Sequence, residues 1–110
     1  MKTKNQSHLS SYLAYCTAQK QLDSKTIKSY MIDLNQFLCF IEDTDVKKLS
    51  IPILESYISS LHAHYKPKTV KRKIASTKAF FHYLEYKEIL EKNPFDKLHI
   101  RFREPILLPK

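Results

Sequence analysis

Residues 67–86, PKTVKRKIASTKAFFHYLEY, decide the fold of this chain. Apolar side chains and one threonine recur here at helical spacing, so one face of a helix carries Val70, Ile74, Thr77, Phe81 and Leu84, with Phe80 beside them. Pro67 can open this helix, because the N–H groups of a first turn have no intrahelical partner and proline has none to lose. Lys66, directly before the proline, should be extended. The pattern predicts that this helix ends at Tyr86 or Lys87 and is the longest in the chain.

The same periodicity predicts three earlier helices, at about residues 8–19, 25–42 and 51–64. Ser7, Ser24 and Ser50 stand where a side chain can cap each of them, and Pro52 falls in the first turn of the third. Their core faces are expected to hold Leu9, Tyr12, Leu13, Cys16, Ile27, Tyr30, Met31, Leu34, Phe37, Leu38, Ile41, Ile53 or Leu54, Tyr57, Ile58 and Leu61. A run of acids after residue 41 disfavours continuation of the second helix, because negative charge opposes the helix dipole at its C-terminus.

The long helix is followed by segments with weaker patterns. A further short turn fits residues 88–91, and Asn93-Pro94 then breaks the helical period. Phe95 and Leu98 are predicted to anchor a turn to the core. Residues 99–110 have no helical period and are predicted to be an extended linker, while residues 1–7 are predicted to be disordered. One helical domain over residues 8–98 is therefore expected.

Composition narrows the possible functions. The chain has 110 residues and no glycine. Phosphate-cradling loops need glycine for positive φ and close backbone approach, so a P-loop and a dinucleotide-binding fingerprint are excluded. Tight two-residue hairpins also depend on glycine, which makes an all-β fold unfavourable. The prediction is an all-α protein with a single core.

Metal, disulfide and membrane features are weak in this sequence. Cys16 and Cys39 are far apart and form no CxxC motif, which favours a reduced compartment. No signal-peptide core or membrane-length apolar run appears, so a cytoplasmic protein without membrane contact is expected. His62 and His64 are two positions apart and point to different helical faces, so no metal is predicted. No cofactor is predicted either.

The predicted long helix also concentrates positive charge. The chain carries a formal net charge of +8, and between Lys66 and His82 every charged residue is basic: Lys66, Lys68, Lys71, Arg72, Lys73 and Lys78. On a helical wheel Ala75 and Ala79 lie beside the long basic side chains, opposite or flanking the apolar stripe. A basic helix with small residues on its outer face suits a DNA major groove. The alternative is an ordinary solvated helix face.

Ordered motifs from Leu9 onward resemble the N-terminal core-binding domain of tyrosine recombinases, the phage-integrase family. Residues 9–41, LSSYLAYCTAQKQLDSKTIKSYMIDLNQFLCFI, contain a Leu-x-x-Tyr-Leu start and a Thr-x-x-x-Tyr-x-x-Asp-Leu centre that begins at Thr26. Residues 67–84 resemble the family's Thr-x-x-Arg-Lys run, with matches at Thr69, Arg72, Lys73, Ile74, Lys78, Phe80, Phe81, Tyr83 and Leu84. Ile89, Asn93-Pro94, Leu98 and the closing Leu108-Pro109-Lys110 complete the resemblance.

The resemblance implies a SAM-like orthogonal bundle of four to five helices, with an extended C-terminal linker toward a catalytic domain. It further implies half of a clamp around recombination-site DNA, in which the second and fourth helices face the major groove. Family and wheel together nominate these DNA-binding residues: Lys25, Thr26, Lys28, Ser29, Lys66, Lys68, Thr69, Lys71, Arg72 and Lys78. Origin from a phage, another mobile element or a chromosomal recombinase is left open.

The sequence departs from the family's pattern in three ways. Met31 and Ile32 stand where the family often has basic residues, which would move backbone contacts to Lys25 and Lys28. The family's Ser-Ala pair reads Ala75-Ser76, so a base contact by this serine is in doubt. Lys78 replaces an arginine, which keeps the charge but loses the bidentate geometry.

The chain is not expected to be an enzyme by itself. The family's nucleophilic tyrosine and its arginine, histidine and lysine partners belong to a C-terminal domain, and no nucleophile–base pair or metal cluster appears here. The expected partners are double-stranded DNA at a recombination site and other recombinase protomers assembled on it, with the isolated chain monomeric. A competing hypothesis is a helical protein-interaction or oligomerisation module.

Overall fold

The computed structural model describes residues 4–42 and 44–98. Four α-helices form its framework: α1 (Lys4–Ala18), α2 (Ser24–Ile41), α3 (Ile51–His64) and α4 (Pro67–Tyr86). Short 3-10 turns, η1 (Val46–Lys48) and η2 (Pro94–Lys97), follow α2 and α4. No strand occurs in these two ranges, so the predicted all-α fold is confirmed.

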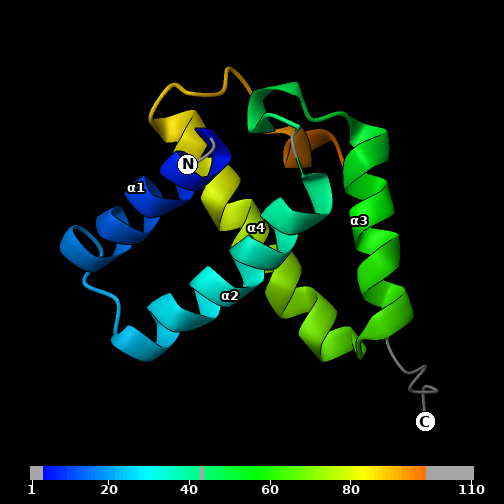
Figure 1. The fold of residues 1–110 in the computed structure, drawn as a ribbon, viewed down its shortest axis with the longest axis horizontal. Helices are drawn as coiled ribbons and strands as arrows, with labels where there is room; N and C mark the ends of the chain where they lie inside the picture. The colour runs from blue at the N-terminus through cyan, green and yellow to red at the C-terminus, as the bar shows by residue number, and fades with distance from the viewer. Residues whose placement is uncertain (1–3, 43, 99–110) are drawn as a thin grey trace, which may run out of the picture.

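Helix α4 lies at the centre of the bundle and packs against α1, α2, α3 and η2. Figure 1 shows α2 crossing α4, with α1 on one side of this crossing and α3 on the other. The predicted stripe of α4 is buried along its length: Val70, Ile74, Thr77, Phe80, Phe81 and Leu84. Edge-on contacts of Phe81 with Phe37 of α2 and with Phe95 of η2 tie three elements together. The expectation that Phe95 anchors a turn is thereby confirmed.

The ends of α3 and α4 agree with the sequence analysis. Ser50 precedes α3 and Pro52 falls in its first turn, although the Ser50 hydroxyl makes no capping hydrogen bond. Lys66 is extended at ψ 155°, and α4 runs from Pro67 to Tyr86 as predicted. Residues 88–91, for which a short turn of helix was expected, form non-helical turns instead.

The starts of α1 and α2 differ from the predictions. Helix α1 begins at Lys4, so residues 4–7 are helical, and Ser7 lies within the helix and does not cap it. The reason is Asn5, which is buried: its Nδ2 donates to the Thr44 carbonyl at 2.7 Å, and its Oδ1 accepts from the Val46 N–H at 3.0 Å. Helix α2 is capped by Asp23, not by Ser24, because the Asp23 carboxylate accepts from the Thr26 N–H at 2.8 Å.

One further expectation, the burial of Met31, is wrong, and others concern residues that the structure does not describe. Met31, assigned to the core stripe of α2, is 40% exposed and lies at its edge. The predicted linker, residues 99–110, and residues 1–3 of the predicted disordered N-terminus fall outside the described residues. In a chain without glycine, Gln21, Glu42 and Glu88 adopt the positive φ values that the connections require.

Candidate nucleic-acid interface

The outward face of α4 carries a line of basic and small residues. Lys68, Arg72, Ala75 and Ala79 recur at spacings of four, three and four, which places them above one another on a helix. Lys68, Arg72 and Ala75 are exposed, and Ala79 is half-buried. Lys71 and Lys78, seven positions apart, lie along one edge of this line and are also exposed. The backbone of α4 can therefore approach a flat or grooved partner closely while these two cations stand along one side of the contact.

Helix α2 presents a second polar face. Lys25, Lys28 and Ser29 are exposed in its first two turns, and Ile32 continues the same side at 54% exposure. Thr26 is partly buried, and its backbone N–H is used by the Asp23 cap. That hydrogen bond holds the pKa of the Asp23 carboxyl below its ordinary value.

A buried carboxylate joins these two faces. Asp33 of α2 is fully buried, and its Oδ1 accepts from Arg72 Nη2 at 3.0 Å and from Lys73 Nζ at 3.1 Å. Its Oδ2 accepts from the Ser76 hydroxyl, also at 3.0 Å. All three donors come from α4. Asp33, Arg72, Lys73 and Ser76 thus form a buried seam between α2 and α4. Because Arg72 also lies on the outward side of α4, the outward faces of the two helices adjoin at this seam.

The Lys73 side chain extends the network toward the start of α4. Its ammonium donates to Gln36 Oε1 at 2.7 Å and lies 4.9 Å from the centre of the Tyr65 ring. Gln36 Nε2 in turn donates to the Tyr65 hydroxyl at 2.9 Å. Lys73 is thus satisfied by an anion, an amide oxygen and an aromatic face, which explains how a lysine can be buried here.

The adjoining faces have a one-sided charge. Between Ser24 and Ile41 the sequence has a single acid, Asp33, which is buried and paired with two cations. Between Pro67 and Leu84 it has none. The exposed charge of both faces is therefore positive, which is the pattern expected of a surface that contacts phosphates.

The structure places the nominated residues as follows. Eight of them are exposed: Lys25, Lys28, Ser29, Lys66, Lys68, Lys71, Arg72 and Lys78. Thr26 and Thr69 are partly buried. Lys73, a basic residue of this stretch that was not among those nominated, is part of the core seam, together with Ser76. Their roles were missed, although Asp33 and Lys73 each occupy a core position of their helix: two opposite charges in two apolar stripes indicate a buried pair.

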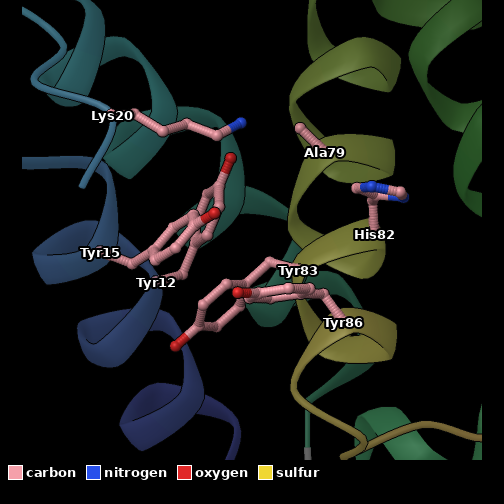
Figure 2. A pocket seen from close by; sticks show the side chains of 7 residues that line it. All are labelled: Tyr12, Tyr15, Lys20, Ala79, His82, Tyr83 and Tyr86. Carbon is pink, nitrogen blue, oxygen red and sulfur yellow. The ribbon is translucent and has the colours of Figure 1, made fainter.

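A second surface feature lies between α1 and α4. Tyr12 and Tyr15 of α1 face Tyr83 and Tyr86 of α4 around a shallow pocket, with Lys20 reaching across from the end of α1 (Figure 2). The ring centres of Tyr12 and Tyr15 lie 5.1 and 5.0 Å from that of Tyr83. Burial raises the pKa values of the Tyr12 and Tyr83 phenols above their ordinary value. Tyr86 is 66% exposed.

Over residues 4–42 and 44–98, no three histidine, cysteine, aspartate or glutamate side chains gather as a metal site would require. None of the helices in those ranges is both long and apolar enough to cross a membrane.

Comparison with known proteins gives a consistent picture. The chain is 61% identical over 105 residues to a tyrosine recombinase of Agathobacter rectalis, an alignment that covers 96% of this chain and 34% of that protein. A tyrosine recombinase of Pseudothermotoga lettingae is 34% identical over 92% of this chain and 38% of its own length. The tyrosine recombinase XerC of Herpetosiphon aurantiacus is 31% identical over 84% of this chain and 32% of its own length.

The chain thus spans about a third of the length of these curated relatives. No solved structure gives a significant match. The model of the phage integrase N-terminal SAM-like domain matches residues 9–88, which include α2, α3, α4 and the seam at Asp33. The predicted resemblance is therefore confirmed, and this chain belongs to the phage integrase N-terminal SAM-like domain family.

Proposed function

We propose that this domain is the DNA-binding arm of a site-specific tyrosine recombinase and that it grips recombination-site duplex through α2 and α4. The observation that carries the proposal is the pair of outward faces that adjoin at the Asp33–Arg72 contact, with exposed cations and no exposed carboxylate between Ser24 and Ile41 or Pro67 and Leu84. A major groove admits one helix, and the phosphates on its walls attract the flanking cations.

The proposed roles follow from position on the helices. Ala75 and Ala79 let the α4 backbone approach the groove, while Lys71 and Lys78 contact phosphates beside it. At the start of α2, Lys25 and Lys28 contact a neighbouring stretch of backbone. Phosphate contacts of this kind set register and orientation on the duplex.

We assign the strand-exchange chemistry to parts of the recombinase that lie outside this alignment. The relatives bear the name tyrosine recombinase, and about two thirds of their length has no counterpart here. In this proposal the arm is a monomer when isolated and meets other protomers on DNA. The arm binds DNA weakly alone, because in the whole recombinase the other DNA-binding parts hold the arm close to its site and so raise its effective concentration there.

The test is an NMR titration of the isotope-labelled 110-residue chain with a short duplex at a low and a high salt concentration. We expect amide shifts at residues 25–29 and 66–78 that diminish as salt rises. Absence of shifts at low salt would overturn the proposal. Shifts confined to other residues would show that a different face binds DNA.

The tyrosine-lined pocket favours a second candidate, a protein-interaction surface. Tyrosine is enriched in protein interfaces, and Tyr86 at this pocket is 66% exposed. A charge-reversed chain with Lys68→Glu, Lys71→Glu and Lys78→Glu separates the candidates. DNA binding predicts loss of duplex affinity with an unchanged fold. A protein-interaction module predicts self-association or partner capture that survives these changes and is lost in Tyr86→Ala.

A further inference from the structure

The Arg72 side chain is held by the core and also reaches solvent. Its Nη2 donates to Asp33 Oδ1 at 3.0 Å, while 54% of the side chain stays exposed. The contact engages one nitrogen of a planar group with five N–H donors. Arg72 is therefore both tethered to the core and open to solvent.

The tether itself is rigid. The Ser76 hydroxyl fixes Oδ2 of Asp33 at 3.0 Å, and Lys73 shares Oδ1 with Arg72 from a side chain that is only 6% exposed. Gln36 and the Tyr65 ring hold Lys73 in turn. Since the carboxylate cannot turn without breaking these contacts, it aims the guanidinium in one direction.

The charges in this seam do not cancel. One carboxylate faces two cations, so the three side chains together carry one excess positive charge. Lys73 is buried, and Arg72 is the cation of this group that solvent can reach. An anionic or electron-rich acceptor outside the protein can satisfy it.

The position of Arg72 on α4 decides which acceptor. It lies in line with Ala75 and Ala79, where the proposed contact brings the helix to a groove floor, whereas Lys71 and Lys78 stand along one side of this line. A guanidinium group held in one orientation can donate two parallel hydrogen bonds to a pair of acceptors at a set spacing. Guanine presents such a pair, O6 and N7, in the major groove. Flexible lysines suit phosphates, which need no such geometry.

We propose that Arg72 is a specificity-determining residue that reads a guanine, and that Asp33 is the positioning residue that aims it. This inference rests on the DNA-binding function proposed above. It assigns to the Asp33–Arg72 pair a role in choosing the DNA sequence, beyond joining two helices. The buried seam thereby connects core packing to base recognition.

The experiment selects duplexes from a randomised pool with the 110-residue chain and then measures affinities for the selected duplex and for single-base-pair changes of it. We expect a G·C pair at one fixed position. Arg72→Lys, which keeps the charge, should lower affinity for the selected duplex by about 5- to 150-fold, the usual range for one bidentate base contact. Its affinity for an unselected duplex should change less than about twofold, because the phosphate contacts remain.

Asp33→Asn should erase the preference at the same base pair while it preserves or raises affinity for the unselected duplex. Glu55→Gln is the matched control, since it removes one negative charge from an exposed position on α3 and should leave the preference intact. A merely structural role for Asp33 would lower both affinities equally. That result, or a base preference that persists in Arg72→Lys, would overturn the inference.

Nitrogen-15 relaxation of the Arg72 side chain provides a measurement that needs no DNA and no altered core. A held guanidinium should show restricted Nε motion in the unaltered chain, and free averaging would overturn the positioning role. Salt-sensitive duplex binding without any base preference would refute base reading and leave the DNA-binding function standing. A chain that binds no duplex at low salt would refute the DNA-binding function itself.

Discussion

The Asp33 carboxylate is buried between two cations, and each member of such a group depends on the others. Lys73 is 5% exposed and uses Asp33 as its anion. Removing one partner of a buried pair leaves an uncompensated charge, whereas removing both partners together costs much less. This dependence arises across 40 positions of sequence, so the wheel of either helix alone shows a charged residue in or beside an apolar stripe but not the partner that neutralises it.

The first prediction concerns this pair. Asp33→Ala should lower the free energy of unfolding by about 3–5 kcal/mol, because Lys73 stays buried without its anion. The double variant Asp33→Ala with Lys73→Met should be more stable than Asp33→Ala alone. Urea denaturation of the two single variants, the double variant and the unaltered chain gives the coupling energy. Additive effects would show that the two side chains do not stabilise one another.

Tyr57 gives a pH-dependent prediction at the same scale. Burial, and then the negative charge of Asp33, raise the pKa of its phenol above the ordinary value of 10.0. The folded state therefore favours the neutral phenol: its contribution is complete below about pH 10 and is lost as pH rises further. Urea midpoints should fall above pH 10 and should fall less in Tyr57→Phe. The exposed Tyr86→Phe is the control, and an equal alkaline slope in both variants would contradict the assignment.

At the scale of helices, local patterns predict the middle of each element better than its ends. The limits of α4 follow from Pro67 and from the end of the apolar period at Tyr86, both of which are local. The start of α1 is not local, because Asn5 forms its hydrogen bonds with residues 44 and 46. Asp23 and Ser24 are both residue types that favour a helix N-terminus. Asp23 is the cap of α2 because the backbone brings its carboxylate to the Thr26 N–H.

The Asn5 contacts lead to a prediction about α1. Asn5→Ala should lower the free energy of unfolding by about 1–3 kcal/mol, because the Val46 N–H loses its acceptor in a buried place. Amide hydrogen exchange should also speed up in the first turn of α1 and at Val46. Asn35→Ala, an exposed asparagine of α2, is the matched control and should change stability little. Unchanged exchange at Val46 in Asn5→Ala would contradict the proposed link.

On the scale of the whole molecule, the fold brings two basic faces together that the sequence shows only as separate stretches. The exposure of the nominated lysines could be predicted from helical period, because charged side chains opposite an apolar stripe face solvent. Helical period could not predict their adjacency, which only the family resemblance implied, since it depends on how α2 crosses α4 and on the Asp33 contacts between them. If these residues contact DNA together, their summed charge attracts the phosphates, and the salt dependence of the binding constant measures that attraction.

A duplex bound through the adjoining faces of α2 and α4 displaces counterions from its phosphates. If five to seven phosphates are neutralised, log K should fall against log salt with a slope between about −4.5 and −6. Lys78→Gln should weaken binding to every duplex alike and make the slope shallower by about 0.9, because one phosphate contact is lost. Lys48→Gln removes the same charge from an exposed position on η1, outside both faces, and should leave the slope unchanged. Fluorescence anisotropy over a range of salt concentrations distinguishes the two variants. If both variants reduced the affinity and the salt slope equally, net charge alone, and not the α2–α4 surface, would attract the DNA. Only an interface at a defined place on the protein makes one lysine more important for binding than another.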